Sequence, residues 1–147
     1  MKVKDIMIKN VTTLSSDIPA MDAVKKLFEL EISGLPVVDS DGRLVGMFTE
    51  KDLLKAILPS YVEKVGKFIY EENPKGTKKK LEDLSGIKVK DLMRKEVVTI
   101  TEETDCYEAA RVMLTQKARR VPVIDRENKV IGIVARCDVL KAFMSGM

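Results

Sequence analysis

The chain has no histidine, no tryptophan and only two cysteines among its 147 residues. The absence of histidine removes the most common general base and the most common metal ligand. The two cysteines, Cys106 and Cys137, do not form a metal-ligand pattern. No apolar stretch is long enough to span a membrane, and none near Met1 resembles a signal peptide. These absences argue against a metalloenzyme and a membrane protein, and they make the cytoplasm the expected location.

Charge of one sign is also not in large excess. The net charge is +3, from 26 basic and 23 acidic residues that are well mixed, as on a solvated surface. The only basic run is 78–80, and no aromatic residues alternate with it, so nucleic-acid binding is not indicated. Hydrophobic residues make up 45% of the chain, which is enough for the core of one globular domain.

The most informative feature is an internal repeat. Residues 3–57 align without a gap on residues 89–143, at a constant offset of 86 (89 minus 3). The paired strings are VKDIM with VKDLM, GLPVVD with RVPVID, and LVGMFTEKDLLKA with VIGIVARCDVLKA. Gapless self-similarity of this length indicates two copies of one supersecondary unit. The sequence therefore predicts a first domain at 1–58, an insert at 59–88 and a second domain at 89–147.

Each copy predicts the order strand, helix, strand, turn, strand, helix. In the first copy, strands are expected at 11–14, 35–39 and 44–49, and a closing helix from Glu50. In the second copy, Thr104 is expected to cap the first helix. The predicted fold class is α/β (α+β), with two β-α-β-β-α units packed through their sheets and a helical insert.

The insert, 59–88, differs in composition from both copies. Its apolar spacing predicts a short amphipathic helix, followed by a turn and a lysine-rich helical piece. We interpret it as a linker that packs along one edge. The alternative is a partner or dimer contact through Tyr61, Phe68 and Tyr70.

Together these strings resemble a tandem pair of cystathionine-β-synthase (CBS) domains, the arrangement called a Bateman module. Both copies match over their full length, and the chain looks like the stand-alone form of the module. The resemblance implies a non-catalytic regulatory protein that senses cellular energy. It also implies an adenosine-containing ligand, AMP, ADP or ATP, in clefts between the two repeats.

The chemistry of such a ligand fits the segment Gly46–Asp52, where a strand runs into a helix. The free N–H groups of a helix start attract phosphate, and Thr49 can add a hydrogen bond. Asp52 has two oxygens for the two ribose hydroxyls, and Gly46 would let the ligand approach the strand. The alternative is that Thr49 and Asp52 only cap the helix. The resemblance favours the ligand, because family members use these two positions for phosphate and ribose.

The second copy departs from this pattern at two places. It keeps the aspartate as Asp138 but has Ala135 where the first copy has threonine. Arg136 then either donates to phosphate or is simply a solvated charge. Before the next strand, the first copy has Ser33-Gly34, whereas the second copy has Arg119-Arg120.

The resemblance implies that the two sites are unequal. In two-fold packed CBS pairs, residues just before this strand resemble those that contact the ligand held by the aspartate of the other copy. The Asp52 site would gain Arg119 and Arg120, with walls from Met93 and Val98. The Asp138 site would have Ser33, Gly34, Met7 and Thr12. The Asp52 site is therefore expected to be the better one for phosphates. The alternative is that the two arginines are solvated charges at a strand edge.

Other functions remain open at this point. The chain could be a structural homodimerisation module with vestigial sites. S-adenosylmethionine is a further candidate ligand, although like-charge repulsion by Arg119 and Arg120 disfavours a cation. A homodimer is expected through the helices that follow Glu50 and Arg136. The resemblance also implies a regulated protein partner, which the sequence leaves unidentified.

Overall fold

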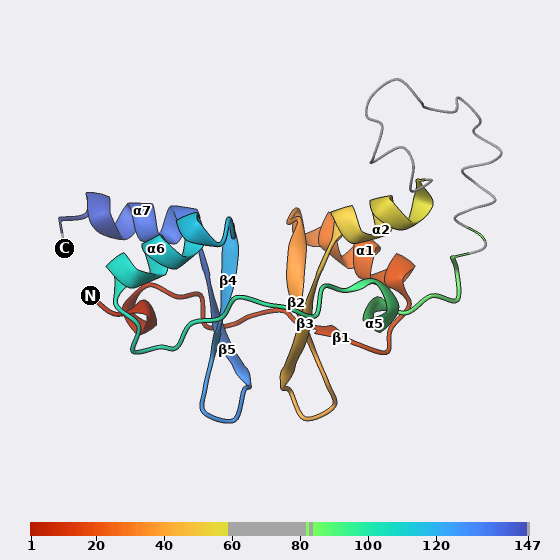
Figure 1. The fold of residues 1–147 in the computed structure, drawn as a ribbon, viewed down its shortest axis with the longest axis horizontal. Coiled ribbons are helices and arrows are strands. Elements are labelled where there is room, and N and C mark those ends of the chain that lie inside the picture. The colour runs from red at the N-terminus through yellow and green to blue at the C-terminus, as the bar shows by residue number, and fades with distance from the viewer. Residues whose placement is uncertain (59–81, 83, 147) are drawn as a thin grey trace, which may run out of the picture. The chain divides into compact units, whose positions relative to one another are not determined.

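The computed structural model describes residues 1–58, 82 and 84–146. The helices predicted within the insert, and the alternative contact through its aromatic residues, lie outside the described residues. The chain divides into two compact units (Figure 1). Unit 1 comprises 1–13, 38–45 and 96–147, and unit 2 comprises 14–37 and 46–95. No helix in the described ranges is long and apolar enough to cross a lipid bilayer.

Most of unit 2 comes from the first sequence copy. Its sheet has the strand order β1-β2-β3, and the far end of the β2–β3 hairpin falls in unit 1. Helices α1 and α2 pack against each other. The elements are β1 (Leu14–Ser15), α1 (Ala20–Leu30), β2 (Gly34–Val38), β3 (Leu44–Thr49), α2 (Glu50–Ile57) and α5 (Val89–Leu92).

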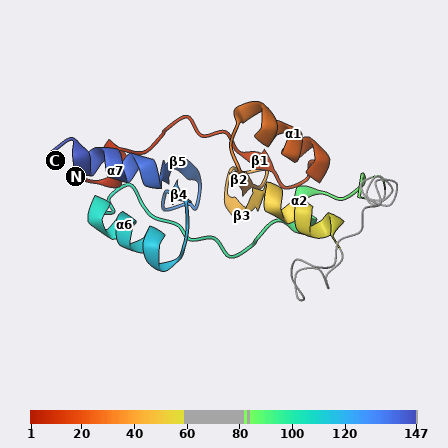
Figure 2. The same cartoon turned by 90° about the horizontal axis from the view of Figure 1, so that it is seen from above.

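Unit 1 has the same plan, built mainly from the second copy. Strands β4 and β5 form an antiparallel ladder in which Arg120 lies opposite Ala135. Helices α6 and α7 pack side by side, as Figure 2 shows from above. The elements are η1 (Val3–Asp5, a 3₁₀ helix), α6 (Cys106–Thr115), β4 (Arg120–Ile124), β5 (Val130–Ala135) and α7 (Arg136–Met144).

The two copies exchange their first segments. Residues 1–13 pack in unit 1, where Val3 is fully buried in a core with Met113, Val121 and Val134. Residues 89–93 pack in unit 2. Each unit is therefore completed by a segment from the other sequence copy, as the red and green ribbons show (Figure 1).

Backbone hydrogen bonds hold both exchanged segments. The N–H of Ile8 donates to the carbonyl of Ile133 at 2.9 Å, and Ile133 returns the bond at 3.0 Å. Met47 and Arg94 exchange two such bonds, each of 2.9 Å. The predicted boundaries at 1–58, 59–88 and 89–147 follow the sequence copies. As domain boundaries they stay a prediction. The two compact units cut across them, because each unit contains residues from both sequence copies.

The mixed α/β fold class is confirmed, and most elements begin and end within a residue of their predicted bounds. Two details differ. The predicted strand at 11–14 is reduced to the two residues of β1, Leu14 and Ser15. The cap of α6 is Asp105, whose Oδ1 accepts from the N–H of Tyr107 at 2.9 Å. Thr104 is unsuited to this role because its hydroxyl already accepts from the N–H of Thr101, at 3.1 Å.

Candidate functional site

The predicted site residues meet the fold at two strand-to-helix junctions. In unit 2, β3 runs into α2 at Thr49, and in unit 1, β5 runs into α7 at Ala135. The N–H of Thr49 donates to Asp52 Oδ2 at 2.8 Å, and its hydroxyl donates to the same oxygen at 3.2 Å. The N–H of Ala135 donates to Asp138 Oδ2, also at 2.8 Å. Both aspartates therefore cap their helices, as the structural alternative predicted.

The same capping bond occurs twice more, outside the predicted sites. The N–H of Lys2 donates to Asp5 Oδ2, and the N–H of Lys88 donates to Asp91 Oδ2, each at 2.9 Å. An aspartate at this position is therefore no sufficient sign of a ligand. Asp52 and Asp138 differ from these two in their surroundings, because they are half-buried whereas Asp5 and Asp91 are exposed.

One carboxylate oxygen stays available at each junction. Within the described part of the chain, Oδ1 of Asp52 and Oδ1 of Asp138 form no hydrogen bond or ion pair. A carboxylate offers about four lone-pair positions for hydrogen bonds, so the cap does not exhaust it. Each aspartate can hold its helix start and still accept a hydroxyl from a ligand.

The two departures in the second copy are coupled through packing. A Cβ atom added to Gly34 would lie 2.7 Å from the methyl carbon of Thr49, so a side chain at position 34 would force the threonine side chain to move. In unit 1 the corresponding pair is Arg120 opposite Ala135. Alanine lacks the methyl group that would meet the arginine. The first junction therefore has a threonine whose methyl group faces a glycine, and the second has an arginine opposite an alanine.

The arginines of unit 1 gather near the second junction. The N–H of Arg136 donates to the carbonyl of Arg119 at 3.1 Å, which ties the start of α7 to the residue before β4. The side chain of Arg136 is exposed and donates from Nε to the carbonyl of Ala118 at 3.2 Å. This bond leaves other donors of the guanidinium available to an anion.

The structure distributes the predicted site residues between the two units. Within unit 2, Gly34 meets Thr49, and Met93 lies against Gly46. Within unit 1, Met7 lies against Gly132 in the same way. Unit 2 contains Ser33, Gly34, Thr49, Asp52 and Met93, and unit 1 contains Met7, Thr12, Val98, Arg119, Arg120, Arg136 and Asp138. The predicted pairing of Arg119 and Arg120 with Asp52 joins residues of different units, and it stays a prediction.

One interpretation of Gly46 is wrong. The sequence suggested that this glycine lets a ligand approach the strand. A Cβ atom at position 46 would instead lie 2.6 Å from the sulfur of Met93 and 2.8 Å from the carbonyl oxygen of Arg94. The space beside Gly46 is thus filled by the chain itself.

The sequence did not distinguish the two cysteines. Cys137 is exposed in the first turn of α7, next to Asp138. Cys106, by contrast, is fully buried, and this burial raises the pKa of its thiol. Only thiolates react readily, so the two cysteines should differ in reactivity.

We expect one thiol per folded chain to react quickly with Ellman's reagent, and the second to react only after denaturation. The fast reaction should disappear in Cys137→Ser and persist in Cys106→Ser. A fast reaction that survives Cys137→Ser would show that Cys106 becomes accessible in the folded protein.

Comparison with known proteins decides the family. The family model described as the CBS domain matches residues 3–59 and 89–145, which are the two sequence copies. This chain belongs to the CBS domain family. The predicted resemblance to a tandem CBS pair is therefore confirmed. The exchanged segments at 1–13 and 89–93 are part of this paired arrangement.

Among its relatives, the chain is 35% identical over 140 residues to an inosine-5'-monophosphate dehydrogenase of Methanocaldococcus jannaschii. The matched region covers 95% of this chain but only 23% of the dehydrogenase's length. It is also 32% identical over 161 residues to the uncharacterized protein MJ1426 of the same organism, covering 98% of this chain and 92% of that protein. CBS pairs thus occur both as parts of enzymes and as most of a small protein.

Two similar solved structures contain adenosine compounds. One is CBSX2 of Arabidopsis thaliana in complex with AMP, at 30% identity and a TM-score of 0.75, covering 98% of this chain and 96% of that one. The other is the CBS pair of protein MJ0100 with 5'-methylthioadenosine and S-adenosyl-L-methionine. It has 29% identity and a TM-score of 0.71, covering 97% and 99%. All three ligands share an adenosine part.

Proposed function

We propose that this protein is a non-catalytic regulatory module that binds an adenosine-containing ligand, AMP, ADP or ATP, at its two strand-to-helix junctions. The observation that carries the proposal is the pair of half-buried aspartates, Asp52 and Asp138, each with one carboxylate oxygen left over after capping its helix. Related CBS pairs with AMP, methylthioadenosine or S-adenosylmethionine bound support the ligand class.

The ribose is the part of the ligand that these aspartates recognise. One ribose hydroxyl donates to the available Oδ1 of Asp52 or Asp138. The second hydroxyl shares an oxygen with the capping N–H, because Oδ2 is already bonded to the start of the helix. Ribose binding therefore depends on an intact helix start, and a ligand in turn stabilises that start.

The phosphates are recognised by different groups in the two units. In unit 2 the donors are the N–H groups of the first turn of α2 beyond Glu50, whose own N–H already donates to the carbonyl of Ser33. The hydroxyl of Thr49 joins them when it turns from Asp52 Oδ2 to the phosphate. In unit 1, Arg119, Arg120 and Arg136 replace that hydroxyl, and an arginine fork suits phosphate oxygens. This positive charge favours nucleotides over S-adenosylmethionine, which is a cation. The arrangement predicted from the sequence, in which Arg119 and Arg120 serve the Asp52 ligand, joins residues of different units and stays a prediction.

A structural module with vestigial sites is the second candidate. It is favoured by the fact that four aspartates form the same capping bond, two of them away from any predicted site. In that case Asp52 and Asp138 have no role beyond the helix start. The two candidates differ in whether nucleotide stabilises the fold.

Millimolar AMP, ADP or ATP is expected to raise the melting temperature. A ligand at a hundred times its Kd stabilises the folded state by about 2.7 kcal/mol, which corresponds to roughly 5–10 °C for a chain of this size. Differential scanning fluorimetry should show this shift, with a smaller one for guanosine nucleotides. Adenosine is the matched ligand without phosphate, and S-adenosylmethionine is the matched ligand with positive charge. The absence of a shift with every adenosine compound would leave the structural module as the function.

We further propose that the regulatory response is self-association as a homodimer, through which the module acts on a protein partner. Exposed apolar side chains on the helices of both units support this, among them Phe28, Leu54, Leu114 and Leu140. The predicted location in the cytoplasm stays a prediction.

A further inference from the structure

The two exchanged segments carry the same short motif. It reads Lys-Val-Lys-Asp-Ile-Met at 2–7 and Lys-Val-Lys-Asp-Leu-Met at 88–93, so only the fifth position differs. In both segments the aspartate closes a turn by accepting the N–H of the first lysine at 2.9 Å. The motif therefore has the same local conformation at both places, although the first copy packs in unit 1 and the second in unit 2.

In unit 1 the motif is held by backbone bonds, a buried side chain and an ion pair. The N–H of Val3 donates to the carbonyl of Thr104 at 2.8 Å, and the N–H of Lys4 donates to that of Glu102 at 3.0 Å. The side chain of Val3 is fully buried, and Lys4 Nζ lies 2.9 Å from Glu103 Oε1. We call residues 102–104, 132 and 133 the unit 1 docking surface.

Unit 2 repeats each of these contacts at the offset of 86 residues. The N–H of Val89 donates to the carbonyl of Ile18 at 2.9 Å, and the N–H of Lys90 donates to that of Ser16 at 3.0 Å. Val89 is also fully buried, and Lys90 Nζ lies 3.2 Å from Asp17 Oδ1. We call residues 16–18, 46 and 47 the unit 2 docking surface.

The methionine completes the match between the two surfaces. Met7 lies against Gly132 and Met93 against Gly46, and each sulfur is 2.6 Å from the place where a Cβ atom of the glycine would be. The residue after each methionine exchanges two backbone hydrogen bonds with the neighbouring strand. Main-chain bonds of this kind hold a segment of any sequence, whereas the places for the valine and the methionine select the sequence.

We propose that each docking surface is a sequence-specific peptide site, and that either surface accepts either copy of the motif. Isoleucine and leucine, which differ at the fifth position, have the same volume, and such exchanges are usually tolerated. A segment that carries this motif on another polypeptide then binds wherever the chain's own segment has left. In the intact chain the tethered segment competes with it, at an effective concentration on the order of 1 mM.

Val3→Asp in the full chain tests this proposal. A carboxylate at this fully buried place should drive the first segment off the unit 1 docking surface. Two fluorescein-labelled peptides, spanning 1–10 and 87–96, are titrated into the variant and followed by fluorescence anisotropy. We expect both to bind, with Kd values within about tenfold of each other. The wild type should bind either peptide about a hundredfold more weakly, because its own segment occupies the surface.

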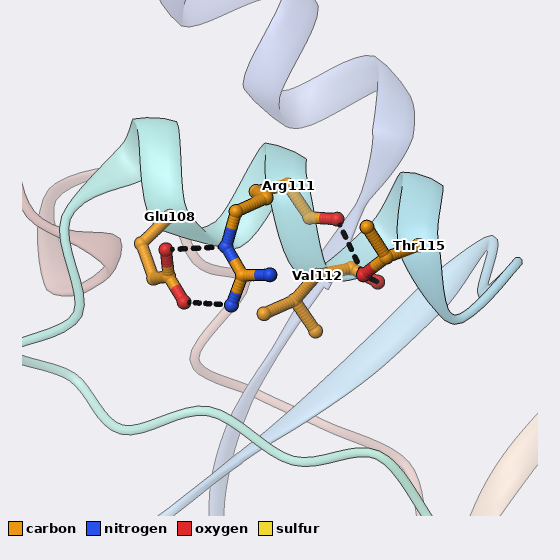
Figure 3. Close-up of polar contacts among 4 residues, drawn as sticks. All are labelled: Glu108, Arg111, Val112 and Thr115. Carbon is orange, nitrogen blue, oxygen red and sulfur yellow. Dashed lines mark hydrogen bonds and ion pairs between the residues drawn. The ribbon is translucent and has the colours of Figure 1, made fainter.

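Glu103→Gln and Glu108→Gln, each made together with Val3→Asp, are matched variants for the ion pair. Glu103 pairs with Lys4 of the motif, whereas Glu108 accepts from Arg111 Nε at 2.8 Å within α6 (Figure 3). We expect Glu103→Gln to weaken both peptides by about two- to fivefold, as for an exposed ion pair. Glu108→Gln removes the same charge outside the docking surface and should leave both Kd values unchanged.

The sequence selection is tested with a 1–10 peptide that itself carries Val3→Asp, which should not bind. Thermal unfolding shows whether the protein variant is folded. If Val3→Asp does not fold, Val3→Ala serves the same titration, because it weakens the hold of the segment without burying a charge. The proposal is overturned if neither peptide binds to a folded variant, if only the 1–10 peptide binds, or if the substituted peptide binds equally well.

Discussion

Gly46→Ala is expected to destabilise the protein by about 1–3 kcal/mol, the usual cost of overpacking a filled core. The new Cβ atom would lie 2.6 Å from the sulfur of Met93 and 2.8 Å from the carbonyl oxygen of Arg94. The methionine side chain can turn away, but the carbonyl cannot, because Arg94 and Met47 exchange two backbone hydrogen bonds. Relief therefore requires the segment at 89–94 to move off β3.

Two further glycines are matched controls for this experiment. Gly132 holds the corresponding place in unit 1, where the backbone carbonyl of Ile8 is farther from the new Cβ, at 3.2 Å. Gly132→Ala should therefore cost less than Gly46→Ala. Gly86→Ala should be close to neutral, since nothing lies within 4 Å of its Cβ position. Urea unfolding measures all three, and equal stability of the Gly46 and Gly86 variants would contradict the close contact.

The exchange of segments explains why this glycine could not be interpreted from the sequence. The repeat shows that VKDIM and VKDLM play the same part, but the pattern is the same whether each packs on its own copy or on the other. The choice depends on pairings between distant residues, such as Ile8 with Ile133, that leave no local signal. Unless it is known that the segment at 89–94 packs against Gly46, a glycine in a strand before a helix suggests room for a ligand.

Local features, by contrast, were predicted well. The sequence predicted a closing helix from Glu50, which is where α2 begins, and the two predicted hairpin turns contain Gly42 and Asn128, both with positive φ angles. Capping was harder to predict, because Thr104 and Asp105 are both good caps, and the choice depends on a local turn in which the hydroxyl of Thr104 accepts from the N–H of Thr101. The coupling of Gly34 with Thr49, and of Arg120 with Ala135, also needs the sheet, since the sequence shows these as separate substitutions.

The four capping aspartates show most clearly what could not be predicted from the sequence pattern. In the sequence, Asp52 and Asp138 gained their assigned role from a family resemblance, whereas Asp5 and Asp91 carried no such assignment. In the structure all four cap a helix through the same oxygen. A test of ligand binding must therefore remove the ligand's acceptor and keep the cap.

Asp52→Asn and Asp138→Asn meet this requirement. The amide oxygen of asparagine still accepts the capping N–H, so the fold should persist, while the amide nitrogen can no longer accept a ribose hydroxyl. Leaving that hydroxyl unpaired costs about 1–3 kcal/mol, or roughly 5- to 150-fold in Kd. Asp91→Asn removes the same charge from an exposed cap and should leave binding unchanged. Titration calorimetry with AMP and ATP measures each binding event.

The double variant Arg119→Ala/Arg120→Ala then shows which aspartate works with these arginines. We expect it to weaken ATP more than adenosine, because charge-assisted bonds to phosphate are lost and adenosine has none. We also expect the double variant to weaken the same binding event that Asp138→Asn weakens, since Arg120 lies opposite Ala135 at that junction. If the double variant instead weakens the binding event that Asp52→Asn weakens, the arrangement predicted from the sequence, with Arg119 and Arg120 serving the Asp52 ligand, is right. If neither asparagine variant changes binding, the two aspartates serve only as helix caps.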